Sequence, residues 1–227
     1  MIDDLFAGMD LYDDRREAPA EGALVLHGYG RTEAPAFLAA VGQIAEEAPF
    51  RHIVTPAGYR MSVAVTSCGP LGWATDAQGY RYSPIEPESG RPWPPMPKEF
   101  SDLARRAAAE AGFSGFAPDT CLINRYAVGS RISLHQDKHE ATYDAPIVSL
   151  SLGLPAIFLF GGFERSAPTT RIILGHGDVM VWGGPSRLRY HAVQPIKPGW
   201  HPDTGEFRIS LTFRKAGRPR REGVSGA

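Results

Sequence analysis

The chain has 227 residues, of which 43% are hydrophobic and 22% charged, a composition that fits one globular domain with a full core. The formal net charge of −1 excludes a protein that holds long nucleic-acid duplexes by bulk positive charge, although it is compatible with a local basic groove. The two cysteines, Cys68 and Cys121, are too few for a disulfide framework and are expected to be buried and reduced.

The first half of the chain predicts two helices around an irregular, aromatic segment. Residues 1–22 are expected to be an irregular N-terminal extension. They carry no signal peptide, and no apolar run reaches a membrane span, so we expect a cytoplasmic protein. We also expect a monomer. After a strand at 23–27, apolar residues recur at helical spacing over 34–48, and a second helix is expected from 97 to Gly112. Between them, residues 50–96 are rich in Gly, Pro and aromatics, with extended pieces at 59–65 and 80–82. Such a segment indicates a lid or binding loop.

The second half of the chain predicts short strands separated by Gly or Pro turns. They are expected at 120–126, 132–137, 147–153, 156–160, 171–174, 179–182, 188–191 and 207–213. Eight strands at this spacing predict a jelly roll, so the fold class is mainly β with flanking helices. We therefore expect one domain over 23–215, with the lid at about 50–96 and the jelly-roll core at about 118–215, followed by a disordered basic tail at 216–227.

One tripeptide, His135-Gln136-Asp137, carries a candidate metal site. In a strand, residues two apart point to the same side, so His135 and Asp137 can bind one ion together, with His191 as the best candidate for a second imidazole. Two His and one carboxylate leave three open positions on an octahedral ion, as in non-haem Fe(II) oxygenases. His176 is a rival for this second imidazole, but it lies in what looks like a tight turn between strands, and His201, in a Pro/Gly loop, is a weaker rival still. His27 and His52 are expected to be surface or structural residues.

Residues 207–214 alternate strictly between apolar odd positions and polar even positions, which predicts a strand with two unlike faces. Its polar face carries Arg208 near one end and Arg214 at the other, and two guanidinium forks can clamp the two carboxylates of a short diacid. Taken alone, the pattern equally suits an edge strand with two surface arginines. Together with the His-x-Asp motif and a later histidine it favours a 2-oxoglutarate pocket.

These motifs occur in the order found in a known family. They are Asn124-Arg125-Tyr126, His135-x-Asp137, His191, the run from Arg208 to Arg214, Thr55-Pro56-x-Gly58-Tyr59-x-Met61-Ser62-Val63, Leu71-Gly72-Trp73, Tyr80-x-Tyr82-Ser83-Pro84 and Trp182-Gly183-Gly184. In them the chain resembles the AlkB family of iron- and 2-oxoglutarate-dependent nucleic-acid dealkylases, and its bacterial members most closely. The resemblance covers about residues 24–214 and implies a double-stranded β-helix (jelly roll) with an N-terminal nucleotide-recognition lid.

The resemblance also implies how the cofactors are held. Fe(II) would be bound by His135, Asp137 and His191, which are therefore the expected catalytic residues. The residues expected to bind 2-oxoglutarate are Asn124, Tyr126 and Arg208 at its far carboxylate, Arg214 at its iron-side carboxylate, and Ser210, where the family often has Asn. O2 is the second co-substrate.

For the nucleic acid, the resemblance implies that Trp73 and His135 sandwich a flipped or single-stranded base. The remaining residues expected to contact the substrate are Thr55, Tyr59, Met61 and Tyr80 in the lid, with Lys138, His139 and Arg165 nearby. His139 stands where the family usually has Asp; an imidazole accepts hydrogen bonds less well and can become cationic near neutral pH. We therefore expect a lesion preference that differs from that of the family.

The implied reaction is oxidative demethylation of N-alkylated bases such as 1-methyladenine and 3-methylcytosine, with release of formaldehyde, succinate and CO2. DNA, preferably single-stranded, is the expected substrate, with RNA as a further one. Two alternatives stay open: the same chemistry on tRNA or a protein side chain, and a metal-binding jelly-roll module without redox activity. The second would not need two arginines on one polar strand face, so substituting Arg208 discriminates between them.

Overall fold

The computed structural model describes residues 15–55, 58–76 and 79–217. Its helices are α1 (Ala34–Glu47) and α2 (Lys98–Glu110), with a 3-10 turn, η1, at Gly184–Ser186. Its strands are β1 (Arg16–Ala20), β2 (Ala23–Leu26), β3 (Arg51–Val54), β4 (Arg60–Cys68), β5 (Gly72–Asp76), β6 (Gly79–Ser83), β7 (Thr120–Tyr126), β8 (Ile132–His135), β9 (Ile147–Gly153), β10 (Ala156–Phe160), β11 (Thr170–Leu174), β12 (Val179–Trp182), β13 (His191–Val193) and β14 (Arg208–Arg214).

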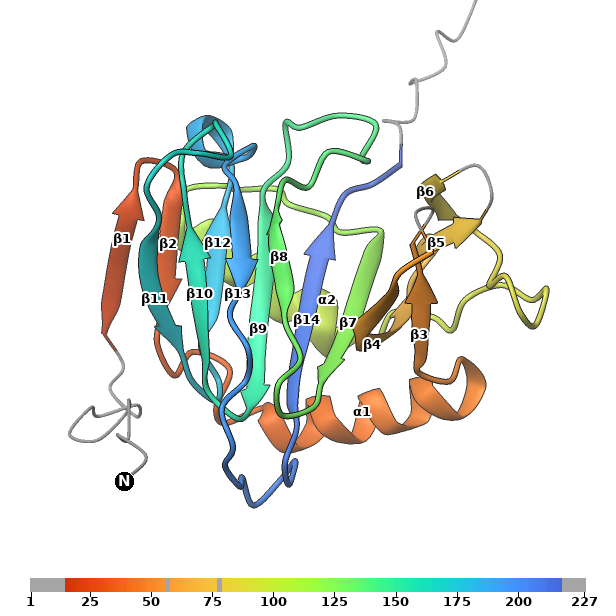
Figure 1. The fold of residues 1–227 in the computed structure, drawn as a ribbon. Coiled ribbons are helices and arrows are strands. Elements are labelled where there is room, and N and C mark those ends of the chain that lie inside the picture. Colours follow the sequence, from red (N-terminus) through yellow and green to blue (C-terminus); the bar gives the residue numbers. More distant parts are fainter. Residues whose placement is uncertain (1–14, 56–57, 77–78, 218–227) are drawn as a thin grey trace, which may run out of the picture.

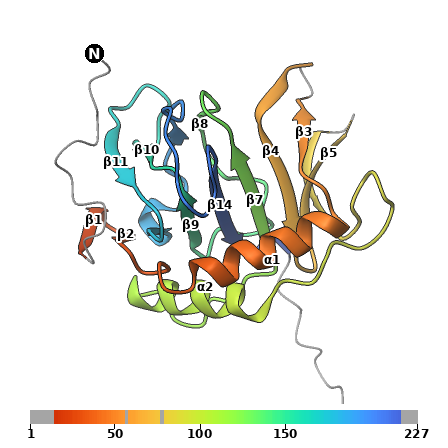
Figure 2. The same ribbon diagram turned by 90° about the horizontal axis from the view of Figure 1, so that it is seen from below.

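Two antiparallel sheets lie face to face (Figure 1). The larger has the order β1-β2-β12-β9-β14-β7-β4-β3, and the smaller has the order β11-β10-β13-β8. Helices α1 and α2 run side by side along the outer face of the large sheet (Figure 2). Strands β5 and β6 form a separate hairpin beside the β3–β4 end of that sheet. The predicted class, mainly β with flanking helices, is confirmed.

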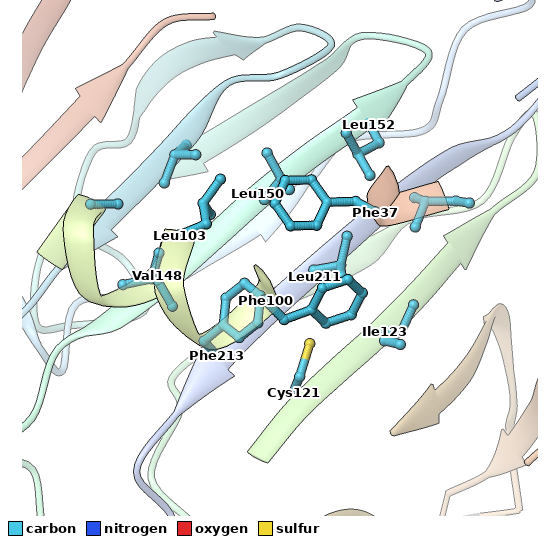
Figure 3. Packing of buried hydrophobic residues seen from close by; sticks show 14 of the residues in the cluster. Phe37, Phe100, Leu103, Cys121, Ile123, Val148, Leu150, Leu152, Leu211 and Phe213 are labelled. Atoms are coloured by element: carbon cyan, nitrogen blue, oxygen red, sulfur yellow. The ribbon is translucent and has the colours of Figure 1, made fainter. Parts of the chain in front are cut away.

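Two hydrophobic cores hold these layers together. The first lies between the helices and the large sheet, where Phe37 of α1 and Phe100 of α2 pack over Leu211 of β14 (Figure 3). The second lies between the two sheets and joins residues such as Phe158 of β10 to Trp182 of β12. Because β14 alternates, its odd residues face the first core while its even residues are left for the space between the sheets.

Three predictions about organisation need correction or division. Residues 1–22 were expected to be irregular, but Arg16–Ala20 forms β1 and pairs with β2. The expected lid, residues 50–96, is divided: β3 and β4 belong to the large sheet, and only the β5–β6 hairpin pairs separately. In the expected tail, the backbone N–H groups of residues 216 and 217 donate to Asp119, so the chain is held there, while residues 218–227 lie outside the described part.

Two strands near the candidate site have different bounds from those predicted. The strand expected over 132–137 ends at His135, and the one expected over 188–191 begins at His191. His135 and His191 form the last pair of the antiparallel β8–β13 ladder. Residue 136 therefore has no residue of β13 opposite it, and the strand ends. Before His191 the chain makes η1, where Pro185 cannot donate a ladder hydrogen bond.

Candidate active site

Three candidate ligands converge where the small sheet ends. His135 is the last residue of β8, His191 is the first of β13, and their rings lie 4.4 Å apart because the two residues are paired. Asp137 follows in the loop, with one carboxylate oxygen 3.8 Å from Nε2 of His135 and the other 3.7 Å from Nε2 of His191. All three ligand atoms lie within 4.8 Å of one another. Asp137 is not in a strand, so the two-residue period is not what brings it there.

The two imidazoles have the hydrogen bonds that metal ligation requires. Nδ1 of His135 lies 2.8 Å from the carbonyl of Ser133, and Nδ1 of His191 lies 3.0 Å from the carbonyl of Arg189. Because a carbonyl only accepts, each Nδ1 carries the proton and each Nε2 keeps a lone pair. Burial, followed by the charge of His135, lowers the pKa of His191 to about 4, so this ring is neutral at neutral pH. These residues fit a divalent metal ion.

Asp137 is held as an anion. Burial by itself raises the pKa of its carboxyl, but Arg214 and the two histidines outweigh burial and hold the pKa well below its usual value. Nη2 and Nε of Arg214 donate to one oxygen of Asp137 at 2.7 and 3.1 Å. A carboxylate fixed in this way supplies a negative ligand beside the two imidazoles.

Behind the candidate ligands, the polar face of β14 closes a small cavity between the sheets. Arg208, Ser210 and Arg214 line it, together with Asn124 and Tyr126 of the neighbouring strand β7. The guanidinium of Arg208 lies 4.9 Å above the Tyr126 ring, and its Nη2 donates to the Ser151 hydroxyl at 2.9 Å. All five residues that sequence predicts for 2-oxoglutarate are thus gathered around one space.

Both arginines of this cavity have donor atoms without partners in the part of the chain that the structure describes. Nε and Nη1 of Arg208 and Nη1 of Arg214 are buried and have no hydrogen-bond partner among the described residues. Burial lowers the pKa of the Arg208 guanidinium. A buried guanidinium with unused donors is costly unless a ligand satisfies it. Because unused donors belong to an arginine at each end of β14, the site fits a molecule with two carboxylates, as 2-oxoglutarate has.

A second, open cavity of about 720 Å³ lies on the other side of the candidate ligands. His135, Asp137 and Arg214 line both cavities, so the three candidate ligands lie between the two cavities. The open cavity is also lined by seven of the residues predicted to contact the substrate: Thr55, Tyr59, Met61, Trp73, Tyr80, His139 and Arg165. Lys138, which was predicted with them, is not among its lining residues.

Aromatic rings form one wall of the open cavity. Trp73 and Tyr80 come from paired strands of the β5–β6 hairpin and stack with their ring centroids 5.0 Å apart and their planes 12° apart. The ring of His139 lies 5.7 Å from that of Tyr80. A flat stack beside an open space suits a planar, unsaturated ligand such as a nucleobase.

The remaining histidines lie outside this group, and the predicted place of one of them is wrong. His27 was expected at the surface, but it is buried, with Nδ1 3.0 Å from the Asp178 carboxylate, because the turn at Gly30 bonds to the turn at Gly177. His176 and His201 stack and, with Asp203, form another group of metal-binding residue types. Their Nδ1 atoms accept backbone N–H groups, however, so each neutral ring carries its proton on Nε2 and suits a metal ion poorly.

Sequence reasoning missed two buried charged residues beside the centre, Glu140 and Arg187. Glu140 follows a run of polar residues that reads as a surface loop, and Arg187 lies in the turn after η1. No local pattern marks either residue, because their burial depends on contacts with distant parts of the chain. The predicted burial of Cys68 and Cys121 as free thiols is confirmed.

Comparisons with known proteins agree with this geometry. Residues 22–214 match the family model of the 2OG-Fe(II) oxygenase superfamily. The chain is 54% identical to the "Alpha-ketoglutarate-dependent dioxygenase AlkB" of Escherichia coli, over 95% of this chain and 98% of that one, and 36% identical to the mouse "Nucleic acid dioxygenase ALKBH1" over 59% and 33%. "The structure of OsALKBH1" is similar with a TM-score of 0.79 and 25% identity, covering 88% of this chain and all of that one. No helix in the described ranges is long and apolar enough to cross a membrane.

Proposed function

Because the chain belongs to the AlkB family of 2OG-Fe(II) oxygenases, whose metal and co-substrate are Fe(II) and 2-oxoglutarate, we propose that it removes N-linked methyl groups from damaged bases in DNA. The observation that carries this proposal is the position of the His135, Asp137 and His191 group. It lies between a small cavity, whose arginines have donors without partners among the described residues, and the open cavity with an aromatic wall. One cavity suits the diacid and the other suits a base.

In this proposal His135, Asp137 and His191 hold the iron, and Arg208 and Arg214 hold the two carboxylates of 2-oxoglutarate, with Asn124, Tyr126 and Ser210 completing the pocket. Bound Fe(II) and 2-oxoglutarate together supply the power to hydroxylate a substrate C–H bond with O2. Arg214 also keeps Asp137 ionised, and the carbonyls behind the histidines keep both Nε2 atoms available. The protein's contribution is therefore to orient the ligands and to hold their protonation states.

Substrate recognition is assigned to the open cavity. Its mouth can take a base that has been flipped out of a duplex or that lies in a single strand, because a base within a stack cannot reach the metal. Trp73 supplies a face for stacking, and a methylated base that carries positive charge stacks more favourably than a neutral one. Hydroxylation of the N-methyl group gives a product that loses formaldehyde and restores the base. The balance is one O2 and one 2-oxoglutarate consumed for one succinate, one CO2 and one formaldehyde.

The test is to load the protein with Fe(II) and 2-oxoglutarate without oxygen and then admit O2 with an oligonucleotide that contains 1-methyladenine or 3-methylcytosine. Succinate and formaldehyde should form in equal amounts with the methylated strand, and His135→Ala should abolish both. Comparing the rates of formaldehyde release from DNA and RNA strands of the same sequence shows which nucleic acid is the better substrate. Formation of succinate without formaldehyde would show that the protein is an oxygenase but that the methylated strand is not its substrate. The absence of both products from the iron-loaded native protein would reject the proposed reaction.

A further inference from the structure

A buried carboxylate next to the proposed centre has no role in the reaction derived above. Glu140 lies in the loop after β8, and its side chain is only 1% exposed. Burying a carboxylate is costly unless it is paired and hydrogen-bonded. Glu140 is therefore placed there by specific partners, and those partners connect it to Asp137.

Glu140 lies between two arginines, and each arginine holds a different part of Asp137. Its Oε2 lies 3.1 Å from Nη2 of Arg187, and its Oε1 lies 3.4 Å from Nε of Arg214. Arg214 donates to the Asp137 carboxylate, while Nη1 of Arg187 donates to the Asp137 backbone carbonyl at 2.8 Å. The two carboxylates thus balance the two guanidinium groups, and both arginines are less than a tenth exposed.

The third partner of Glu140 comes from the hairpin. The Tyr82 hydroxyl donates to Oε1 of Glu140 at 2.8 Å. Tyr82 lies in β6, directly opposite Trp73 of β5, so it belongs to the element that carries the aromatic wall. Burial raises the pKa of Tyr82 well above its usual value, which keeps the phenol protonated as a donor. The hydrogen bond from Tyr82 to Glu140 therefore links the hairpin with the aromatic wall to the two arginines that hold Asp137.

We propose that Glu140 is a positioning residue: it orients Asp137 for metal binding through Arg187 and Arg214, and it couples the β5–β6 hairpin to the metal centre through Tyr82. The inference rests on the proposed function in one respect, that Asp137 is a metal ligand. By reciprocity, a ligand that moves the hairpin changes metal affinity by the same factor as the metal changes affinity for that ligand.

The test uses Co(II) as the probe, titrated into the metal-free full chain and followed by its visible absorption bands, so no turnover is needed. Glu140→Gln keeps the shape of the side chain and removes its charge; we expect metal affinity to fall by about tenfold or more, the usual effect of losing a residue that orients ligands. The matched control is Glu88→Gln, because Glu88 is 75% exposed and lies outside this group. Unchanged affinity in Glu140→Gln would overturn the proposal.

Tyr82→Phe tests the link to the hairpin and leaves every charge in place. We expect a smaller loss of Co(II) affinity than in Glu140→Gln, and no further loss when the two substitutions are combined, because Tyr82 acts through Glu140. Tyr143→Phe is the control, since its hydroxyl donates to the backbone carbonyl of Lys138 in the same loop, and the substitution keeps the ring that packs on Arg187. Additive losses, or equal affinities in Tyr82→Phe and its control, would overturn the coupling; if Glu140→Gln does not fold, this comparison alone decides.

The outcome is separable from that of the proposed function. A native protein that binds Co(II) but releases no formaldehyde from methylated DNA would reject the proposed substrate, and the two substitutions would still decide the role of Glu140. A native protein that does not bind Co(II) would overturn the metal centre and the positioning role together.

Discussion

Arg208 offers the sharpest separation between a binding residue and a structural one. Its guanidinium is buried, its Nη2 donates to Ser151, and two of its nitrogens have no hydrogen-bond partner among the described residues. A purely structural arginine would have its donors satisfied, and its removal would weaken the fold. A residue prepared for an absent anion should behave in the opposite way. We therefore predict the effects of Arg208→Met on the 2-oxoglutarate-free and 2-oxoglutarate-bound protein separately.

The two effects have opposite signs. Hydrogen bonds to a charged group are worth about 1.5–3 kcal/mol each, so losing the two donors should cost about 3 kcal/mol or more of binding, or about a hundredfold in the Kd for 2-oxoglutarate. Without 2-oxoglutarate, removing two unsatisfied buried donors should gain about 4 kcal/mol, offset by about 2 kcal/mol for the Ser151 hydrogen bond and about 1 kcal/mol for the stacking on Tyr126. The Tm of the ligand-free variant should therefore equal or exceed that of the native protein by up to about 4 °C.

The assay combines calorimetric titration of 2-oxoglutarate into the Co(II)-loaded protein with thermal unfolding, each measured with and without the co-substrate. Arg125→Met is the matched control: Arg125 neighbours Tyr126 on β7, but its guanidinium packs over Phe50, away from the cavity. The control should keep native affinity. A variant Arg208→Met that melts several degrees lower and still binds 2-oxoglutarate normally would refute the reasoning, because it would show that Arg208 is structural.

Three further predictions concern specificity, pH and packing. His139→Asp should change the ratio of kcat/KM for 1-methyladenine and 3-methylcytosine strands. The hydrogen bond that His27 donates to the Asp178 carboxylate, with burial opposing it, raises the pKa of His27 above 6.5. The stability that this interaction gives is therefore full below pH 6.5 and is lost as pH rises through the folded-state pKa. Urea unfolding from pH 5 to 9 should therefore show a gap between native protein and His27→Gln that narrows with rising pH. Leu150→Ala, in the first core, should cost about 2–5 kcal/mol in urea unfolding.

Each of these three has a result that contradicts it. An unchanged lesion ratio would remove His139 from substrate selection. If the difference in stability between the native protein and His27→Gln widens as pH rises, His27 is buried in its neutral form. If Leu150→Ala lowers the free energy of unfolding by less than about 1 kcal/mol, the first core repacks to fill the cavity left by the missing side chain. Val54→Ala is the reference, because Val54 is exposed.

Local sequence pattern predicted the parts of this site that are organised by a repeat. The alternation over residues 207–214 predicted the polar face of β14 because a strand sorts its residues by parity, and the structure gathers Arg208 and Arg214 on one cavity as expected. His135, Asp137 and His191 are also gathered as predicted, and the metal-binding role of each remains a prediction. In contrast, the strand bounds around them depend on which residue lies opposite, and single-segment patterns do not contain that information.

The features that sequence missed are those created by contacts between distant segments. β1 is an edge strand that contains Pro19, so its propensity for strand is low and pairing with β2 decides its structure. Glu140 looks like a surface residue until Tyr82 and Arg187 arrive from segments 58 and 47 residues away. His27 is buried only because the turn near Gly177 closes over it. Charged residues of this kind carry no periodic signal.

The position of β14 has a consequence for how the protein is made. This strand comes last among the described strands, yet it lies inside the large sheet, hydrogen-bonded to β7 on one side and β9 on the other (Figure 1). During synthesis, β7 and β9 therefore leave the ribosome without the strand that joins them, and α1 and α2 have no complete surface to cover. A chain that stops before residue 208 lacks both arginines and a continuous sheet. The large sheet and the co-substrate pocket are therefore completed by the same strand. A truncated chain that retains His135 and His191 but lacks β14 should be incompletely folded, and we expect proteases to degrade it before it binds iron.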